Sequence, residues 1–220
     1  TSKGNKLMLV VKDISVKIGA ILALKGFSLE VKKGQMVALI GRNGAGKTSL
    51  LKSIIGVNKL TKGSIFFENL DLENLASHSR AALGIGYMPE DRGLIPELTV
   101  EENILLPSWT LKQLNGDERL SLVYTIMPEL KEMRDRKALL LSGGQQKMAA
   151  LGRALVAGTQ LLLLDEPFEG VAPALSQRLG EVIRGLKEQN LSIILSQSEL
   201  NHTQDIFDKQ YVIERGENVI

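Results

Sequence analysis

The stretch GRNGAGKT at residues 41–48 constrains the fold of this chain more than any other feature. It follows the continuous apolar run QMVALIG (35–41), which is typical of a strand buried on both faces. It precedes KTSLLKSIIG (47–56), where apolar residues recur at helical spacing and Gly56 favours a helix end. A strand, a glycine-rich turn and a helix in this order form the context in which the pattern GxxxxGK[ST] binds phosphate.

The turn suits phosphate because its glycines let successive backbone N–H groups point inward, beside the positive end of the following helix. Lys47 adds a full charge near the β and γ phosphates, and the hydroxyl of Thr48 can bind Mg²⁺. The residues expected to bind the phosphates are Gly41, Arg42, Asn43, Gly44, Ala45, Gly46, Lys47, Thr48 and Ser49.

The motif LLLLDEP (161–167) supplies a second part of the predicted site. Asp165 ends a buried strand at the edge of the sheet that also carries the phosphate loop, so its carboxylate can hold the Mg²⁺ shell. Glu166 can face the γ-phosphate and polarise an attacking water. The alternative is a pair of carboxylates at a strand end, one of which caps the next helix.

Short apolar runs alternate with helical patterns along the chain, which predicts an α/β fold. Strands are expected at 6–11, 27–31, 35–41, 63–68, 85–88, 161–165, 192–196 and 210–216, with 161–165 and 192–196 as central parallel strands. Residues 91–156 hold three of the six prolines, the only tryptophan and helical patterns at 99–106, 117–132 and 143–157. We interpret them as a helical lobe inserted into an α/β core formed by 1–90 and 157–220.

Composition narrows the function classes. Hydrophobic residues make up 44% of the 220 residues, enough for a substantial core. The 27 Lys and Arg residues nearly balance the 25 Asp and Glu residues, which argues against a nucleic-acid partner. The absence of Cys excludes disulfides and thiolate metal sites, in keeping with a cytosolic environment. No apolar run reaches the roughly 18 residues that a membrane span needs, so we expect any membrane role to depend on a partner.

A second glycine turn lies in LSGGQQK (141–147). Ser142 stands at the N-cap position of the following helix, with Gly143 and Gly144 behind it. Its hydroxyl and the following N–H groups make a second candidate anion site. A chain with one complete phosphate loop does not need another, and the alternative is an ordinary capped helix.

GRNGAGKT, LSGGQQK and LLLLDEP, in this order, resemble the motifs of ABC transporter ATP-binding subunits, and the resemblance covers nearly the whole chain. It implies an α/β P-loop NTPase (RecA-like) core with an antiparallel β subdomain and an inserted α-helical subdomain. It implies an ATPase that uses ATP and Mg²⁺. It also implies head-to-tail pairing with a second ATP-binding subunit, as a homodimer or heterodimer, in which Ser142, Gly143 and Gly144 reach the partner's γ-phosphate.

The stretches IGYMPEDRGLIPELTVEENILL and GVAP resemble more narrowly the importers of branched-chain amino acids and their urea and amide relatives. This implies integral membrane permease subunits, an indirect solute-binding protein, and a peripheral position at the cytoplasmic face of the inner membrane. Glu90 stands where most relatives have a Gln that links ATP to the membrane subunit, so it is expected at the nucleotide and the metal. Ala172 replaces the usual D-loop Asp.

The resemblance also implies a groove near Glu90, Asp91 and 93–109 that receives a helix of the membrane subunit. Trp109 is expected to pack within the lobe. Phe168 is expected to pack, and Glu169 to be a solvated interface residue.

Two positions depart from the family pattern. Ile18 stands where an aromatic ring usually stacks on adenine, so about 1 kcal/mol of stacking is lost. Ser198 stands where most relatives have a switch His, and the importer subgroup often has Gln. A Ser hydroxyl can bind a γ-phosphate oxygen but carries no charge, which predicts slower hydrolysis. His202, four residues further on, is either a substitute for the missing imidazole or a surface residue.

Three alternatives remain at this point. DEPFEGV resembles lipid-type exporter ATPases, which share the fold and chemistry. A non-transport ABC ATPase is disfavoured by the single cassette and the lack of a coiled-coil repeat. A slow subunit paired with an active sibling is the third.

Overall fold

The computed structural model describes residues 6–199 and 204–219, which form two sheets and surrounding helices. The antiparallel sheet contains β1 (Leu7–Ile18), β2 (Ile21–Lys32), β4 (Lys62–Phe67) and β5 (Leu70–Asp71), in the order β2-β1-β4-β5. The larger sheet contains β3 (Met36–Ile40), β6 (Ile85–Met88), β7 (Leu161–Asp165), β8 (Ser192–Gln197), β9 (Lys209–Glu214) and β10 (Glu217–Val219), in the order β10-β9-β3-β8-β7-β6. Its pairs are parallel except β9 with β10.

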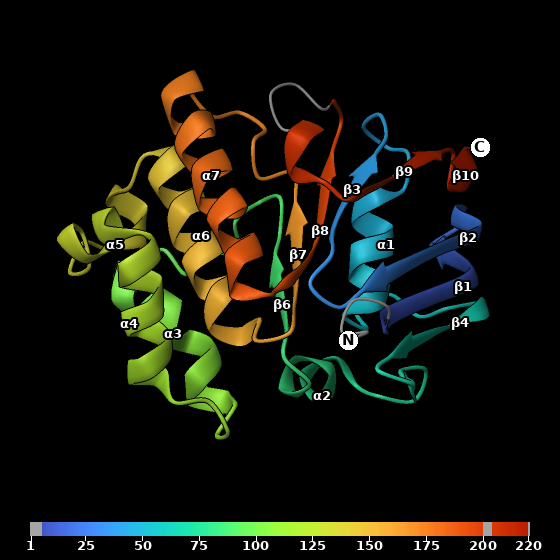
Figure 1. Cartoon of the computed structure of the whole chain (residues 1–220), viewed down its shortest axis with the longest axis horizontal. Coiled ribbons are helices and arrows are strands. Elements are labelled where there is room, and N and C mark those ends of the chain that lie inside the picture. The colour runs from blue at the N-terminus through green and yellow to red at the C-terminus, as the bar shows by residue number, and fades with distance from the viewer. Residues whose placement is uncertain (1–5, 200–203, 220) are drawn as a thin grey trace.

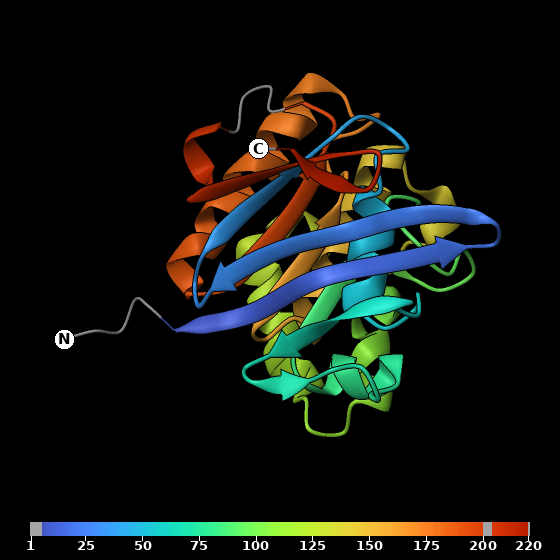
Figure 2. The ribbon, with the colours of Figure 1, turned by 90° about the vertical axis from the view of Figure 1, so that its right-hand side faces the viewer.

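The helices enclose the larger sheet. They are α1 (Lys47–Ile54), α2 (Ser77–Ala82), α3 (Val100–Thr110), α4 (Gly116–Ile126), α5 (Pro128–Glu132), α6 (Gly143–Ala157) and α7 (Pro173–Leu186). Figure 1 shows α6 and α7 over one face of this sheet, with α3 to α5 outside α6, and α1 on the other face. Figure 2 shows the long β1–β2 hairpin crossing in front of α1, so the antiparallel sheet covers that helix.

Residues 161–164 of β7 and 193–195 of β8 are continuously apolar because both faces of these strands are buried. In β7, Leu162 and Leu164 join one core with α6 and α7, whereas Leu161 and Leu163 join a second core with α1 and the antiparallel sheet. The predicted central parallel position of β7 and β8 is confirmed, since β7 pairs with β6 and β8, and β8 also pairs with β3.

The helices of the predicted lobe share a core with the sheet. Ile104 of α3, Val123 of α4 and Leu130 of α5 belong to the same buried cluster as Leu162 and Ile193 of the sheet. The single helix expected at 117–132 is instead α4 and α5, because a proline lacks the N–H needed inside a helix and Pro128 opens a new one. The lobe boundaries at 91–156 stay a prediction.

Trp109 does not pack within the lobe as expected. It is 55% exposed near the end of α3. It lies five residues after the buried Ile104, about 140° around the helix axis, and therefore faces away from the core.

Two further elements differ from their expected extent. β1 and β2 each run for 12 residues, well beyond 6–11 and 27–31. Pairing on both sides carries β1 past a register shift near Asp13, whose φ is 46°. The last expected strand, 210–216, ends in a turn at Arg215 and Gly216, both with positive φ, before β10.

Within the described part of the chain, no helix has the length and apolar character needed to cross a lipid bilayer.

Candidate functional site

The glycine-rich loop joins β3 to α1, as the sequence predicts. Gly44 (φ 80°) and Gly46 (φ 116°) adopt left-handed conformations that favour glycine. Gly46 is also the N-cap of α1 and has no side chain with which to occupy the helix start. The first N–H groups of α1 therefore remain open to an anion.

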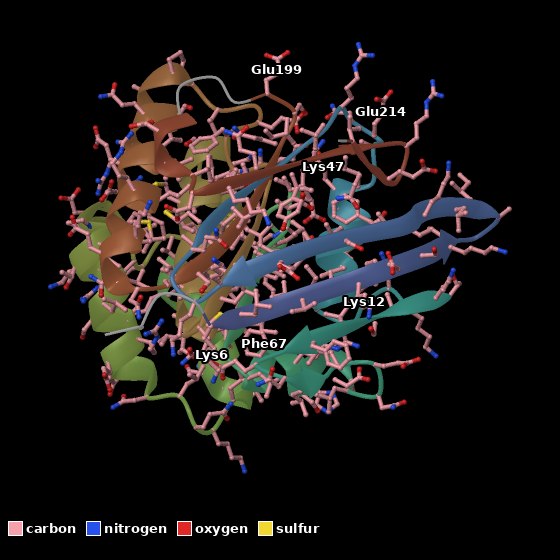
Figure 3. All side chains as sticks on the ribbon, turned by 45° about the vertical axis from the view of Figure 1, so that its right-hand side comes forward. Lys6, Lys12, Lys47, Phe67, Glu199 and Glu214 are labelled. Carbon is pink, nitrogen blue, oxygen red and sulfur yellow. The ribbon has the colours of Figure 1, made fainter. Side chains whose placement is uncertain are left out.

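Lys47 is buried beside the loop, and its charge is already paired. Its Nζ donates to the carbonyls of Gly41 and Arg42, the latter at 3.1 Å. It also lies 2.9 Å from Oε1 of Glu166, and the two side chains are only 4% and 7% exposed. Figure 3 shows Lys47 inside the molecule, whereas Lys12 lies on the surface. A phosphate entering the loop would replace Glu166 as the partner of this ammonium group.

Asp165 is completely buried at the end of β7 and held from two sides. Ser196 Oγ donates to its Oδ1 at 2.6 Å, and the Tyr87 hydroxyl donates to its Oδ2 at 3.3 Å. Burial, reinforced by the charge of Asp165, raises the pKa of Tyr87 far above its ordinary value. Tyr87 therefore stays protonated and acts as a permanent donor to this carboxylate.

Glu166 follows in a left-handed backbone conformation, with φ 49°. Its N–H donates to the carbonyl and the hydroxyl of Ser196, at 3.1 and 3.2 Å. Its own carbonyl accepts from Lys147 Nζ at 2.7 Å. Asp165 binds Ser196 and Tyr87 while Glu166 binds Lys47, so the two adjacent carboxylates face different partners and can do different work.

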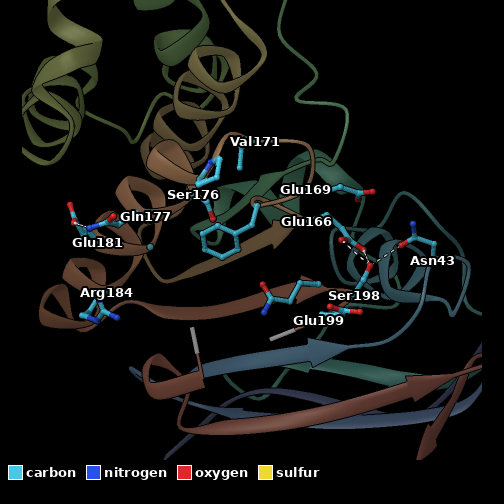
Figure 4. A pocket seen from close by; sticks show the side chains of 14 residues that line it. Asn43, Glu166, Glu169, Val171, Ser176, Gln177, Glu181, Arg184, Ser198 and Glu199 are labelled. Carbon is cyan, nitrogen blue, oxygen red and sulfur yellow. Dashed lines mark hydrogen bonds between the residues drawn. The ribbon is translucent and has the colours of Figure 1, made fainter. Parts of the chain in front are cut away.

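Ser198 joins the phosphate loop to Glu166. Its hydroxyl donates to Asn43 Oδ1 at 2.8 Å and lies 3.4 Å from each carboxylate oxygen of Glu166. Figure 4 shows these three residues together at one end of a cavity of about 890 Å³ that extends along α7. The predicted alternative, His202, lies outside the described residues.

Glu90 lies just after β6, near the other carboxylates. Burial, together with the negative charges of Glu169, Asp165 and Glu166, raises its pKa above the ordinary value. The structure therefore brings Glu90 into the electrostatic surroundings of the site.

The residues after Glu166 have mixed environments. Phe168 is half-buried and packs against the core beneath α6 and α7, as expected, whereas Glu169 is exposed. Ala172 is the N-cap of α7 and provides no side-chain cap.

The second glycine turn is separate from the first. Ser142 caps α6 through a reciprocal pair of hydrogen bonds with Gln145, at 3.0 and 3.2 Å. A Cβ at Gly144 would clash with Cδ2 of Leu175 on α7, so that leucine side chain would have to move. α6 packs on α3, α4, β6 and β7, whereas α1 packs on β2, β7 and β8. Ser142 and Gly143 are exposed at the start of α6, and α6 lies on the opposite face of the larger sheet from α1 (Figure 1).

Ile18 ends β1, where it pairs with Ile21 across the hairpin turn. It is 49% exposed, and Ile21 is more exposed still. The nearby β2 residues Ala23 and Leu24 lie against Gly46 of the phosphate loop. The hairpin therefore presents apolar surface close to the loop.

Sequence reasoning missed three residues of this site, namely Tyr87, Lys147 and Ser196. Ser196 is a polar residue that follows the apolar run 193–195 in a buried strand, and Lys147 is a charged residue on the buried face of α6. Both are unusual placements that the sequence could have signalled. Tyr87 has no comparable signal, because a tyrosine in a strand is ordinary.

A glycine-rich loop between a parallel strand and a helix, with a buried Asp at the end of a second strand, defines a P-loop nucleotide-binding protein. A family model described as ABC transporter matches residues 24–169. The chain therefore belongs to the ABC transporter family and is an ATPase of that family.

The chain is similar to several transporter subunits. It is 38% identical to the high-affinity branched-chain amino acid transport ATP-binding protein BraG of Pseudomonas aeruginosa, over 97% of this chain and 91% of that protein. It is 33% identical to a probable branched-chain amino acid transport ATP-binding protein, LivF, of Archaeoglobus fulgidus, over 70% of this chain and 66% of that protein. It is 31% identical to the lipopolysaccharide export system ATP-binding protein LptB of Haemophilus influenzae, over 70% and 65%.

Solved structures share the fold. One is an ATP-binding cassette of an ABC transporter in its ADP conformation, with TM-score 0.83 and 30% identity over 98% of this chain and 90% of that chain. Another is a dimeric cassette in a post-hydrolysis state bound to ADP and Pi, with TM-score 0.86 and 25% identity over 97% of both chains. These similarities confirm the predicted fold class.

Proposed function

We propose that the chain is the ATP-hydrolysing subunit of an importer of branched-chain amino acids or related small amides. It would drive integral membrane permease subunits from the cytoplasmic face of the inner membrane, with a solute-binding protein delivering the cargo. The observation that carries this proposal is the similarity to BraG, which extends over 97% of the chain. The similarity to the lipopolysaccharide exporter subunit is lower and stops at 70%.

The chemistry is phosphoryl transfer from ATP to water. The loop N–H groups and Lys47 bind the β and γ phosphates and stabilise the charge that develops during transfer. Glu166 accepts a proton from the attacking water, and its contact with Ser198 orients its carboxylate. Ser198 donates a neutral hydrogen bond near the γ-phosphate, so we propose slower hydrolysis than a charged donor would allow.

Thr48, Asp165 and Glu90 are the proposed residues of the Mg²⁺ site. The donor set fits this ion, because Mg²⁺ prefers oxygen ligands and usually keeps several waters and phosphate oxygens besides one or two carboxylates. In the described residues, no group of three or more His, Asp or Glu side chains is arranged to hold a metal ion. When bound, Mg²⁺ would neutralise phosphate charge and orient the γ-phosphoryl group.

The second glycine turn serves a partner subunit in this proposal. Ser142, Gly143 and Gly144 are exposed or partly exposed at the start of α6, on the other side of the sheet from α1. A second ATP-binding subunit, paired head to tail, would present its bound ATP to them. Ile18 and its neighbours on the hairpin would contact adenine without ring stacking.

A groove of about 580 Å³ is the proposed docking site for a permease helix. It is lined by α2, β6 and the end of α3, including His78, Tyr87, Pro107 and Leu111. Of the expected Glu90, Asp91 and 93–109, only Pro107 lines this groove, because its other walls come chiefly from α2, β6 and the chain just after 109. Tyr87 lines this groove and also donates to Asp165, so the proposed docking groove and the proposed ATP site are adjacent.

Purification of the tagged chain from detergent-solubilised membranes of its own cells, followed by mass spectrometry and a proteoliposome uptake assay, tests the proposal. We expect permease subunits to co-purify, and ATP-dependent uptake of labelled leucine, isoleucine or valine. Glu166→Gln should abolish uptake without preventing assembly. Co-purification of lipopolysaccharide export components, with no amino-acid or amide uptake, would instead support the exporter alternative suggested by the similarity to LptB.

A further inference from the structure

Lys147 is a buried lysine at the base of the second glycine turn. It lies in the second turn of α6 and is only 2% exposed. Its Nζ donates to the backbone carbonyl of Glu166 at 2.7 Å. Among residues 6–199 and 204–219, no carboxylate lies within ion-pair distance of this ammonium group. A side chain of the motif LSGGQQK therefore binds the backbone of the motif LLLLDEP.

This placement carries an energetic cost that packing alone does not require. Burying an ammonium group without a paired anion is unfavourable, and a methionine would fill similar volume without a charge. The inward positions next to it on α6, Met148 and Leu151, are apolar. The lysine is therefore placed for its hydrogen bond rather than for burial.

The backbone that Lys147 holds is itself unusual. Glu166 has φ 49°, a left-handed conformation that L-residues adopt at a cost and that persists only when its surroundings enforce it. Ser196 binds the N–H of Glu166 from β8, and Lys147 binds the carbonyl from α6. The two contacts grip the peptide groups on both sides of the Glu166 side chain.

We propose that Lys147 is a positioning residue for ATP hydrolysis, which holds the backbone of Glu166 so that its carboxylate meets the attacking water. This inference rests on the proposed role of Glu166. It makes α6 a direct link between the turn that serves the partner's ATP and the carboxylate that acts on the chain's own ATP.

The charges around Lys147 agree with this role. Burial and then the neighbouring Arg92 lower its pKa, while Glu169, Glu166 and Glu90 oppose that change. Arg92 donates to Gln146 on the same helix at 3.1 Å. The ammonium group thus belongs to the electrostatic field of the active site.

The test compares Lys147→Met, which removes the donor, with Lys147→Arg, which restores one. Arg119→Met is the matched control, because Arg119 also donates to a backbone carbonyl, that of Leu155 at the far end of α6. Each full-length variant is measured for kcat, ATP dissociation constant, thermal midpoint and amide hydrogen exchange of the peptide around Glu166. Glu166→Gln is the reference for lost chemistry.

We expect Lys147→Met to lower kcat by about tenfold or more, to leave the ATP dissociation constant within about twofold, and to speed exchange near Glu166. Lys147→Arg should recover most of the rate, and Arg119→Met should match the unmodified chain in both rate and local exchange. Normal kcat and unchanged exchange in Lys147→Met would overturn the inference. So would a parallel loss of rate, affinity and thermal midpoint, because that pattern indicates a structural role.

The reference variant separates the two proposals. If hydrolysis survives Glu166→Gln, the proposed role of Glu166 fails, whatever Lys147→Met does. If Glu166→Gln stops hydrolysis while Lys147→Met keeps its rate, only the role of Lys147 fails. The exchange measurement reports on the backbone of Glu166 even where hydrolysis is too slow to compare.

Discussion

At the scale of single residues, Glu166 and the ATP phosphates compete for the ammonium group of Lys47. Their ion pair is short and nearly dry, with 2.9 Å between Nζ and Oε1. Such a pair is strong in a low-dielectric interior, and the three N–H groups of Lys47 are all engaged, by Glu166 and by the carbonyls of Gly41 and Arg42. In the proposed function, ATP binding therefore includes the opening of this pair.

Glu166→Gln should therefore tighten ATP binding while it stops hydrolysis. The neutral amide leaves Lys47 without its carboxylate partner and removes repulsion toward the γ-phosphate. We expect the ATP dissociation constant to fall by about tenfold, which corresponds to about 1.4 kcal/mol. Equilibrium binding of ATP to the purified chain measures this. Glu169→Gln, a change of the exposed neighbour, is the control, and an unchanged or weaker affinity in Glu166→Gln would contradict the competition.

The second prediction for a single residue concerns Ser198 and the rate of ATP hydrolysis. Replacement by His puts an imidazole at the position from which the hydroxyl now contacts Asn43 and Glu166. A charge-assisted donor exceeds a neutral one by about 1 kcal/mol, so kcat for ATP hydrolysis should rise by up to about fivefold. Ser176→His, the same change elsewhere on the wall of the cavity in Figure 4, should leave kcat unchanged. A rate that stays level or falls in Ser198→His would refute the idea that Ser198 limits hydrolysis.

At the scale of elements, an ion pair joins α5, one of the helices outside α6, to α7. Arg178 of α7 makes two hydrogen bonds to the carboxylate of Glu129 on α5, at 2.6 and 3.1 Å, and a third to the carbonyl of Ile126. This bidentate geometry is the strongest form of such a pair, although both side chains are about one third exposed. It connects α7, which begins just after Glu166, to the helices outside α6.

This ion pair predicts a pH-dependent stability. The hydrogen bond from Arg178 lowers the pKa of Glu129 below its ordinary value of 4.5. A lowered folded-state pKa contributes stability above the ordinary pKa, and that stability is lost as pH falls through the folded-state value. Glu129→Gln should therefore lower the free energy of unfolding by about 1 kcal/mol or less at pH 7, and the difference should shrink below about pH 4.5.

Urea unfolding of both proteins across this pH range measures the effect. Glu132→Gln on the same helix is the control, because its exposed carboxylate has no ion pair among the described residues. A gap between the Glu129→Gln and unmodified proteins that stays constant with pH would contradict the assignment.

At the scale of the whole molecule, the two candidate anion sites are at the starts of helices on opposite faces of the larger sheet. α1 and the antiparallel sheet lie on one face, and α6 and α7 lie on the other (Figures 1 and 2). We propose that the exposed turn at Ser142 serves the phosphate loop of a second subunit rather than that of its own chain. A second subunit, in head-to-tail orientation, would complete each site.

Cross-linking tests this arrangement, and the chain is convenient for it because it contains no Cys. One protein carries Glu166→Gln and Arg42→Cys, and the other carries Glu166→Gln and Ser142→Cys. We expect a short bifunctional thiol reagent to join the two proteins when ATP is present and to join few of them without it. Each protein alone is the control. Absence of ATP-dependent cross-links, both in the mixture of the two proteins and in the assembled transporter, would contradict the shared site.

The sequence by itself was enough to predict the features that depend on residues close together in the chain. The loop 41–48 works through its own glycines and the helix that follows, so its position and its lysine could be predicted from spacing. The buried strands were evident because a strand covered on both faces is largely apolar, as residues 161–164 are. The start of α6 could be predicted in the same way, because Ser142 and Gln145, three residues apart, form a capping box.

Only the tertiary structure decided what depends on residues far apart in the chain. The pairing of Lys47 with Glu166, the hold of Lys147 on the carbonyl of Glu166, and the bond from Tyr87 to Asp165 join segments whose separation no local pattern encodes. The physical reason is that hydrogen bonds and ion pairs act over a few ångströms in space. Which distant groups come within that range is determined by how strands and helices pack around the shared cores.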